Sequence, residues 1–160
     1  MAFFEEDGEA RLVLTKRPEH MPSHRGEIAF PGGTVQPDTD TTVLDAALRE
    51  AEEEIGLPRA AVEVCAELDG ISTVATRFTI TPFVGLLAHR PALVPDPREV
   101  AAILDVALSE LLDDGVYREE RWDLGLPDRA IHFFELPGET VWGATARILA
   151  SFLEHLVAER

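Results

Sequence analysis

Four glutamates lie within five consecutive positions, residues 50 to 54, of the segment LREAEEEIGL. Like charges one helical turn apart destabilise a helix by about 0.2–0.5 kcal/mol per pair, so this clustering needs a compensating partner. At about 100° per residue, Glu50, Glu53 and Glu54 share an arc of about 100°, and Glu52 lies on the opposite flank. Hard cations such as Mg²⁺ and Mn²⁺ prefer carboxylate oxygens as ligands. The spacing therefore predicts a divalent-metal site, and the alternative is a solvated acidic helix face.

The glutamates belong to a helix that the sequence predicts from about residue 43 to residue 55. Apolar residues recur there at helical spacing and define one inward face, turned away from the three glutamates: Leu44, Leu48, Ala51 and Ile55. Thr41 or Thr42 can cap its start, and Gly56 is typical of a helix end. The helix follows a Pro-Gly-Gly turn at 31–33, where glycine allows backbone atoms to approach a ligand closely.

The rest of the chain predicts the elements that position this helix. Apolar runs, alternating or continuous, predict strands at 10–17, 26–30, 62–68, 78–88, 99–106 and 130–136. The long runs at 78–88 and 99–106 are typical of central strands buried on both faces. SELLDD predicts a short helical turn, and residues 115–129 predict an exposed, charged loop.

A second long helix is expected in the C-terminal segment TVWGATARILASFLEHLVAER, residues 140–160. One apolar stripe runs along it and predicts packing on the sheet: Val141, Thr145, Ile148, Phe152 and Leu156. Two main helices among several strands favour an α/β fold, an α/β/α sandwich with a mixed β-sheet. The length fits one domain over 1–160.

The charge balance limits the partners of the chain. Among 160 residues, 30 acidic against 14 basic residues give a net charge of −16. Nucleic acids and anionic membrane surfaces are held by clustered Lys and Arg, so neither is an expected partner. There is no signal-like segment, and no apolar run approaches the roughly 18 residues of a membrane span, so we expect a soluble, cytoplasmic protein. The single cysteine, Cys65, excludes an internal disulfide and is expected to be buried in a strand.

Residues 49–57, REAEEEIGL, resemble the second half of the Nudix box, G-x5-E-x7-R-E-U-x-E-E-x-G-U, in which U is aliphatic. This resemblance implies a mixed-sheet α/β/α fold and hydrolysis of a nucleoside diphosphate linked to another moiety, with Mg²⁺ or Mn²⁺ as cofactor. By the same resemblance, Glu50, Glu53 and Glu54 form the group of metal ligands and base. Arg49 is expected to orient these carboxylates.

The first half of the box departs from the family pattern. Counted back from Arg49, the box requires Gly at 35 and Glu at 41, where this chain has Val35 and Thr41. Because the glycines lie at 32 and 33, the loop is about two residues longer, and the first glutamate is missing. In the family that glutamate helps to anchor the arginine. Here either Asp40 in the loop or Asp45 on the helix can take its place.

Two further segments resemble the coenzyme A pyrophosphatase subgroup of this family. Residues 13–33, VLTKRPEHMPSHRGEIAFPGG, are similar to its LLTxR strand, basic loop and G-x-[VI]-x-F-P-G-G segment. Residues 141–149, VWGATARIL, are similar to its IWG-x-TA helix start. The resemblance implies cleavage of coenzyme A or an acyl derivative to adenosine 3′,5′-bisphosphate and (acyl-)4′-phosphopantetheine. The alternatives are ADP-ribose or another nucleoside diphosphate derivative as substrate, or a non-catalytic module that binds a nucleotide.

Several residues outside the helix are candidates for contact with such a substrate. Positive charge and the flexible turn near FPGG suit a ligand with several phosphates, and the candidates are Lys16, Arg17, Arg25, Gly32 and Gly33. Each cation can instead be a surface charge that balances a nearby glutamate. Glu99, in the loop before a strand, is a candidate for an extra ligand or base. Trp122 can contact substrate or cover an apolar edge, and Phe30 can stack on a base or belong to the core. A homodimer is possible.

Overall fold

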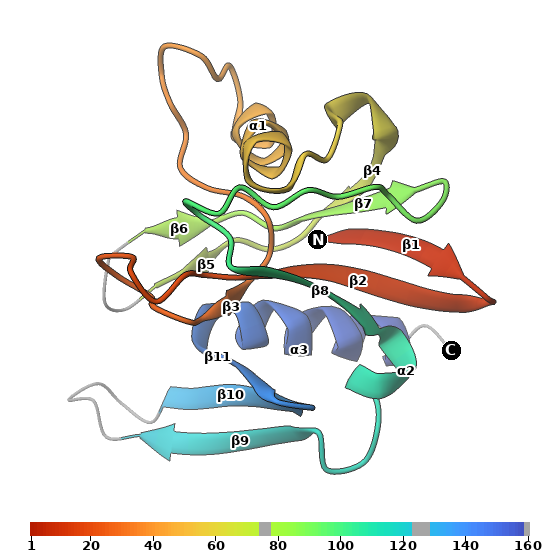
Figure 1. The fold of residues 1–160 in the computed structure, drawn as a ribbon. Helices are drawn as coiled ribbons and strands as arrows, with labels where there is room; N and C mark the ends of the chain where they lie inside the picture. The colour runs from red at the N-terminus through yellow and green to blue at the C-terminus, as the bar shows by residue number, and fades with distance from the viewer. Residues whose placement is uncertain (74–77, 123–128, 159–160) are drawn as a thin grey trace.

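The computed structural model describes residues 1–73, 78–122 and 129–158, and at its centre is a mixed β-sheet with a helix on each face (Figure 1). The strands of this sheet are β1 (Ala2–Glu6), β2 (Glu9–Lys16), β3 (Ile28–Ala29), β4 (Val62–Glu67), β7 (Phe83–Leu87) and β8 (Ala102–Ala107). β1 and β7 run parallel, and the other pairs are antiparallel. α1 (Val43–Ile55) lies on one face and α3 (Gly143–Ala158) on the other. The expected α/β/α sandwich with a mixed sheet is confirmed.

β2 is the strand around which the sheet is arranged. The order is β3-β2-β1-β7-β4, and β8 also pairs with β2. β1 pairs with residues 9–13 of β2 and β3 pairs with Thr15 and Lys16, so both lie along one edge, end to end. β8 pairs with residues 11–16 along the other edge. After β3 the chain passes through the Pro-Gly-Gly turn and crosses to α1 on one face of the sheet (Figure 1).

Alternate residues of β1 and β2 pack against different helices. Phe3 and Leu12 belong to the core cluster on the α3 side, whereas Phe4 and Val13 belong to the cluster that contains Ile55 of α1. A fully buried side chain of this size contributes about 1.5–3 kcal/mol to stability. The pleat of the two strands therefore holds both helices, and the position of α1 is fixed by its buried face.

α1 begins and ends where the sequence predicts. Thr42 is the N-cap: its side chain accepts from the Asp45 N–H at 3.0 Å, and Asp45 accepts in return from the Thr42 N–H at 2.9 Å. Gly56 ends the helix in the left-handed conformation at φ 66°. Of the predicted inward face, Ala51 and Ile55 are buried, whereas Leu44 and Leu48 are half-buried.

The hairpin of β1 and β2 contains a strand that the sequence analysis did not assign. β1 pairs with β2 from Ala2–Val13 to Glu6–Glu9, and Asp7 and Gly8 form the turn with φ values of 55° and 80°. Positive φ at both turn residues matches the right-handed twist of the strands, and Asp-Gly is a favoured pair for it. The Asp7-Gly8 dipeptide was therefore the sequence signal for this hairpin.

A second sheet replaces much of the loop predicted over 115–129. β9 (Tyr117–Trp122), β10 (Arg129–Leu136) and β11 (Glu139–Trp142) form three antiparallel strands. β9 is mostly charged, but its end residues pack on β10: Tyr117 lies 5.3 Å from Phe134 and Trp122 lies 6.1 Å from Phe133, ring centre to ring centre. The loop prediction is wrong for 117–122, and its residues 123–128 lie outside the described ranges.

The C-terminal helix starts later than predicted. β10 and β11 form a hairpin in which Gly138 has φ 80°, so Val141 is a strand residue and α3 begins at Gly143. The buried positions of α3 are Ala146, Ile148, Leu149, Ala150 and Leu153. The predicted stripe shares only Ile148 with this set, and Leu156 is 36% exposed. The stripe was shifted because it was counted from a residue that belongs to β11.

The predicted strand at 78–88 is divided in two. β6 (Thr79–Ile80) pairs with β5 (Ile71–Ser72), and β7 follows after Pro82, which has no N–H for a ladder bond. Leu86 on β7 is 46% exposed, and β8 is only partly buried at the edge of the described sheet. β7 is central, between β1 and β4, and is buried or half-buried except at Leu86, so the expectation of central strands buried on both faces holds for most of β7 and is wrong for β8.

The remaining elements are short. η1 (Arg59–Ala61) leads into β4, and α2 (Leu108–Leu111) confirms the helical turn predicted for SELLDD. Cys65 is exposed rather than buried, because β4 is the last strand in the order of the described sheet and its residues 65–67 are all exposed. Within the described ranges, no helix is long and apolar enough to cross a membrane.

Candidate active site

The Pro-Gly-Gly turn places the backbone directly against two of the clustered glutamates. The Gly32 N–H donates to Glu54 Oε2 at 3.0 Å, and Gly32 has φ 142°, which side chains rarely allow. A Cβ atom on Gly33 would lie 2.6 Å from Cδ of Glu50. Both glycines therefore permit the close approach of the turn to α1. The substrate contact predicted for them remains a prediction.

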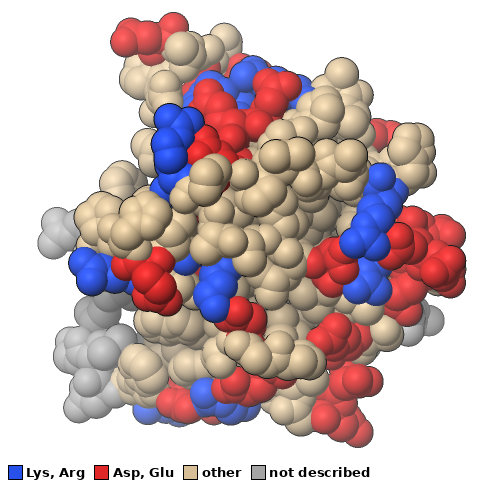
Figure 2. Space-filling view, in the orientation of Figure 1, with Lys and Arg blue, Asp and Glu red and all other residues tan. Residues whose placement is uncertain are grey.

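Three carboxylates converge beside this turn. Glu50, Glu54 and Glu99 each offer an oxygen, and these oxygens lie within 4.8 Å of one another. Oxygen ligands about 2.0–2.6 Å from one cation are separated by distances of this order, so the three side chains fit a shared divalent ion. Figure 2 shows the acidic side chains that gather over α1, with basic side chains beside them. α1 supplies two of the carboxylates, and the loop before β8 supplies the third.

Glu54 is the least exposed member of this cluster. It retains 6% of its accessible surface, and its carboxylate accepts the Gly32 N–H. Burial is the main cause that raises the pKa of Glu54 to about 7, and the negative charges of Glu50 and Glu99 contribute to this rise. The nearby charge of Arg17 opposes this rise. A buried carboxylate surrounded mainly by other carboxylates is stabilised in its charged form by a cation.

Arg49 is buried on another side of α1 and is surrounded by acceptors. Its Nε and Nη2 each donate to Asp40 at 2.9 Å, and Nη2 also donates to the Thr34 carbonyl at 3.1 Å. Nη1 pairs with Glu50 and with Glu53, each at 2.9 Å. These bonds raise the pKa of Arg49, with Asp40 as the largest cause. Arg49 therefore holds one oxygen of Glu50, as expected of a residue that orients the carboxylates.

The structure decides between the two aspartates considered for the missing glutamate of the box. Asp40 forms the bidentate pair with Arg49, and this pairing lowers the pKa of Asp40. Its side chain is 1% exposed. Asp45 instead accepts from the N–H groups of Thr41 and Thr42 at the start of α1. Asp40 is therefore the residue that anchors the arginine.

Glu53 lies apart from the carboxylate cluster. Its side chain is 56% exposed and pairs with Arg49 one turn earlier on α1. The group of three acids that could share an ion contains Glu99 in its place. The ligand role predicted for Glu53 remains a prediction, and its substitution tests it below.

Asp96, which the sequence analysis did not select, organises the loop that carries Glu99. Its N–H donates to the Glu54 carbonyl at 2.8 Å, and its side chain accepts the Arg98 N–H at 2.9 Å. Bonds from the Arg98 side chain and backbone lower the pKa of Asp96 to about 2. An Asp followed by Pro is typical of such a turn, so the segment PDPREV carried the signal.

The predicted basic residues differ in what they contact. Arg17 has a buried Nε with no hydrogen-bond partner in the described part of the chain, and it lies near enough to Glu54 to influence its pKa. Lys16 Nζ pairs with Glu139 at 2.5 Å. Arg25 is exposed and donates to the Met21 carbonyl at 2.8 Å. Among these three cations, Arg17 is the one with a buried donor left over for a ligand.

The aromatic candidates have structural contacts. Phe30 is partly buried against the core on the α3 side. Trp122 is 40% exposed, packs 6.5 Å from Trp142 between ring centres, and donates to Glu120 at 2.6 Å. Trp122 covers Phe133 on the small sheet, which agrees with the alternative that it shields an apolar edge.

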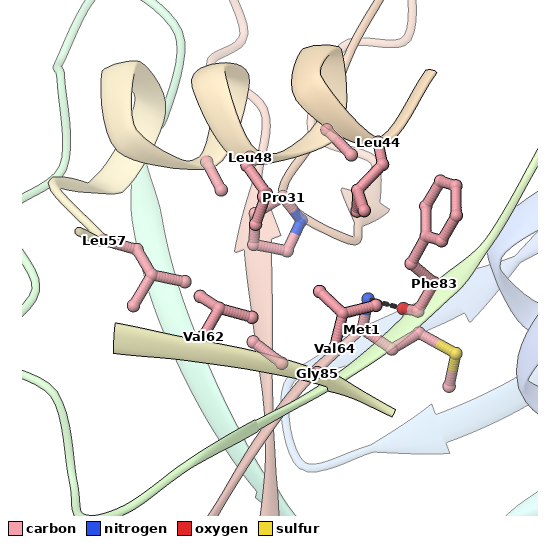
Figure 3. Close-up of a pocket in the computed structure, with 12 residues that line it drawn as sticks. Met1, Pro31, Leu44, Leu48, Leu57, Val62, Val64, Phe83 and Gly85 are labelled. Atoms are coloured by element: carbon pink, nitrogen blue, oxygen red, sulfur yellow. Dashed lines mark hydrogen bonds between the residues drawn. The ribbon is translucent and has the colours of Figure 1, made fainter. Parts of the chain in front are cut away.

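A cavity of about 50 Å³ lies between α1 and the strands β4 and β7 (Figure 3). Leu44 and Leu48 point into it from α1, opposite Val62 and Val64. The Met1 amino group donates to the Phe83 carbonyl at 2.7 Å at its edge. The side chains that line it carry no carboxylate, so the cation ligands are confined to the other flank of the Pro-Gly-Gly turn.

Comparison with known proteins identifies the family. A family model described as NUDIX domain matches residues 1–122. The chain is 36% identical over 138 residues to the Nudix hydrolase NudL of Photorhabdus laumondii, which covers 86% of this chain and 73% of that protein. The chain belongs to the Nudix family.

Two further comparisons agree with this membership. Nudix hydrolase 22, chloroplastic, of Arabidopsis thaliana is 38% identical over 151 residues, which are 90% of this Nudix chain and 49% of that protein. The chain thus spans about half the length of the plant relative. The crystal structure of the M. smegmatis Nudix hydrolase RenU matches with a TM-score of 0.59 and 24% identity, over 71% of this chain and 70% of that one, and shows the shared fold.

Membership supports a hydrolase of nucleoside diphosphate derivatives that uses a divalent metal. The residues present fit such an ion, because the cluster of Glu50, Glu54 and Glu99 offers only carboxylate oxygens. This donor set suits Mg²⁺ or Mn²⁺ and lacks the thiolate and imidazole ligands that softer ions prefer.

Proposed function

We propose that this Nudix hydrolase cleaves the pyrophosphate bond of coenzyme A or an acyl-coenzyme A, with Mg²⁺ or Mn²⁺ as cofactor. One water is consumed, one P–O bond of the diphosphate breaks, and the products are adenosine 3′,5′-bisphosphate and (acyl-)4′-phosphopantetheine. The observation that carries the hydrolytic role is the convergence of Glu50, Glu54 and Glu99 beside the Pro-Gly-Gly turn. The resemblance of residues 13–33 and 141–149 to the coenzyme A pyrophosphatases supports the choice of substrate.

In this proposal the carboxylate cluster holds the cation, and Arg49 orients the carboxylates. Glu50, Glu54 and Glu99 are the ligands that geometry favours, and the Gly32 N–H fixes one oxygen of Glu54. Arg49 fixes one oxygen of Glu50, which leaves the other free to face the cluster. A bound cation supplies charge neutralisation for the diphosphate and lowers the pKa of the attacking water.

Arg17 is the proposed contact for a phosphate of the substrate. Its Nε is buried without a hydrogen-bond partner among the described residues, and an unpaired buried donor is costly unless a ligand satisfies it. A guanidinium pairs with phosphate through charge-assisted bonds. Arg25, exposed at the surface of the same segment, is available for a second phosphate, whereas Lys16 must first leave Glu139.

A phosphate-product assay over a nucleotide panel tests this function. Coenzyme A, acetyl-coenzyme A, dephospho-coenzyme A and ADP-ribose are each incubated with the protein and either Mg²⁺ or Mn²⁺, with Glu54→Gln as the control for contaminating hydrolase. We expect the largest kcat/KM for coenzyme A or its acetyl derivative, and no turnover after chelation of the metal. Because Arg17 and Arg25 are the cations available for phosphate groups, dephospho-coenzyme A is expected to be the poorer substrate.

Other outcomes of the same panel contradict the proposal in defined ways. Faster cleavage of ADP-ribose than of coenzyme A refutes the substrate assignment and retains the chemistry. Tight binding of a nucleotide without product in either metal refutes hydrolysis and supports a module that only binds. Turnover by the Glu54→Gln protein equal to that of the unmodified protein refutes the role of the cluster.

A further inference from the structure

We propose that Asp96 is a positioning residue of the candidate active site, because its side chain caps the turn that brings Glu99 to Glu50 and Glu54. The inference rests on the proposed function, since it concerns the same carboxylate cluster. Asp96 is not one of the three acids of the cluster. It acts through Glu99.

The turn after Asp96 is held by one hydrogen bond to the side chain of this residue and two to its backbone carbonyl. Its side-chain Oδ1 accepts the Arg98 N–H at 2.9 Å. Its carbonyl accepts the N–H groups of Glu99 at 3.0 Å and of Val100 at 2.8 Å. Asp96 therefore satisfies three consecutive N–H groups, in the manner of a residue that caps the first turn of a helix. The direction of the Glu99 side chain follows from this turn.

The same loop is attached to the residue that carries the most buried carboxylate. The Asp96 N–H donates to the Glu54 carbonyl at 2.8 Å, and the Val94 N–H donates to the Ile55 carbonyl at 2.9 Å. These carbonyls belong to the last turn of α1, where no intrahelical donor follows. At the other end, Val100 is 2% exposed in the core. These backbone hydrogen bonds thus fix the position of the loop that carries Glu99 relative to Glu54.

Glu99 itself has little else to fix its position. It is exposed, whereas Glu54 is buried and Glu50 is paired with Arg49. The capped turn is therefore what keeps the third carboxylate within 4.8 Å of the other two. The ion pair of Asp96 with Arg98 is not what holds the turn, because the Arg98 side chain is 82% exposed and surface ion pairs contribute little to stability. The N–H cap and the ion pair can be separated by substitution.

The test measures Mn²⁺ affinity of the nucleotide-free protein by electron paramagnetic resonance. We expect Asp96→Ala and Glu99→Gln each to raise the Mn²⁺ Kd by about 10- to 100-fold, the usual effect of losing a ligand's supporting partner. Because Asp96 acts through Glu99, the double variant should bind no more weakly than Glu99→Gln alone. Asp96→Ser retains a short capping oxygen and should stay within about three-fold of the unmodified protein. Arg98→Gln removes the ion pair, keeps the cap and should do the same.

Asp96→Glu provides a second variant should Asp96→Ala fail to fold. It keeps the charge and the pairing with Arg98, but glutamate is a poor cap, so the weakening of Mn²⁺ binding is again expected. Unchanged affinity in Asp96→Ala or Asp96→Glu, or additive losses in the double variant, overturns the proposal. Loss of affinity in Arg98→Gln equal to that in Asp96→Ala also overturns it, since the ion pair would then be the cause.

The proposal and the proposed function fail in distinguishable ways. A protein that binds Mn²⁺ and responds to these substitutions as stated, but cleaves no nucleotide, refutes the function alone. An active protein whose Mn²⁺ affinity is insensitive to Asp96→Ala refutes the positioning role alone.

Discussion

Two buried carboxylates beside α1, Asp40 and Glu54, have their charges balanced in opposite ways. Asp40 forms a bidentate pair with Arg49, and that arginine lowers its pKa. Glu54 has one backbone N–H and two acidic neighbours, and its pKa is raised to about 7. On one side of the helix the carboxylate is fully paired within the chain, whereas on the other the nearby charge of Arg17 does not offset burial and the two acidic neighbours. The difference separates a structural anchor from a site that binds a cation.

The comparison also shows why the acidic stretch of α1 is tolerated. Arg49 is placed between the two sides and pairs with acids on both, including Glu50 of the cluster. It compensates part of the repulsion that a run of glutamates creates. The repulsion that remains acts mainly on Glu54. Five experiments can break or sharpen this contrast, and they follow from the largest expected effect to the smallest.

Substitution of Glu54 should have the largest effect on activity. Glu54→Gln keeps an oxygen for the Gly32 N–H but removes a charged ligand, so we expect kcat/KM to fall by about 1,000-fold or more, roughly 4 kcal/mol of transition-state stabilisation. Circular dichroism should show an unchanged fold. The matched control is Glu52→Gln, whose side chain pairs with Arg59 at the surface. Near-normal turnover by Glu54→Gln would remove the distinction between the two sides.

Substitution of Asp40 should affect stability rather than the cluster. Asp40→Ala leaves Arg49 buried without its main partner, and breaking such a pair should lower Tm by about 10 °C. The comparison variant is Asp45→Ala, which removes a cap and should lower Tm by only a few degrees. Thermal denaturation followed by circular dichroism measures both. The reverse order would mean that Asp45, and not Asp40, anchors the arginine.

The raised pKa of Glu54 predicts a pH dependence of the metal-free protein. The folded state, with a pKa of about 7, binds more protons than the unfolded state, with its ordinary value of 4.5. The free energy of unfolding should therefore fall as pH rises from 4.5 to 7, by about 2–3 kcal/mol, and Glu54→Gln should lack this loss. Urea denaturation in the presence of EDTA, at steps between pH 4.5 and 8, measures the difference between the two proteins.

Magnesium provides the control for that measurement. An ion that binds only the folded protein stabilises it, and the gain should be larger at pH 8 than at pH 5, where Glu54 is protonated. If the difference in free energy of unfolding between the unmodified protein and Glu54→Gln, measured without metal, stays constant with pH, Glu54 has an ordinary pKa.

Substitution of Gly33 should have a moderate effect on metal binding. In Gly33→Ala the new Cβ would meet Cδ of Glu50 at 2.6 Å, so the Glu50 carboxylate must shift from its present position beside the turn. We expect Mn²⁺ affinity to fall by about ten-fold, close to 1.4 kcal/mol. Gly70→Ala is the control, because its Cβ would meet its nearest atom at 3.4 Å and lies outside the site. Isothermal titration with Mn²⁺ measures both, and equal affinities would contradict a close fit of turn and helix.

Glu53 should give the smallest effect. Its pairing with Arg49 is exposed, and a pair one turn apart on a helix contributes only about 0.3–0.5 kcal/mol. We expect Glu53→Gln to change Mn²⁺ affinity and kcat/KM by less than about three-fold, the factor that corresponds to this energy. A loss as large as that of Glu54→Gln would instead establish Glu53 as a ligand in the loaded protein.

The local elements of the site could be predicted from sequence because their signals are short in range. Thr42 and Gly56 bound α1 as expected, since a cap and a left-handed glycine act within one turn. The motif around Arg49 also indicated the family, which the comparisons confirm. The sequence indicated only that the Pro-Gly-Gly turn could approach a ligand; its contact with α1 was not predicted, because it depends on where the helix lies over the sheet.

The errors concern residues whose state is decided by tertiary partners. β9 is a charged strand that exists because β10 lies beside it, and neither hydrophobic period nor propensity reports a neighbour of this kind. Cys65 is exposed because β4 lies at the end of the strand order, and the sequence does not report that place in the sheet. The choice between Asp40 and Asp45 required the path of a loop. The Asp-Pro pair indicated a turn at Asp96, but the bond of this residue to the Glu54 carbonyl depends on where that loop meets α1.

The segment between the Pro-Gly-Gly turn and α1 is bonded at both ends, and in between the Thr34 carbonyl accepts from Arg49 while residues 36–40 bond to one another. Gly32 is bonded to Glu54 at one end and Asp40 to Arg49 at the other, while residues 34–39 project from the molecule and are exposed (Figure 1). Insertions at such a tip leave the geometry at its base unchanged. The two residues by which this chain exceeds the family pattern are accommodated there. A reporter peptide grafted at Asp38 would therefore extend from this exposed tip and leave the contacts of α1 with the turn intact.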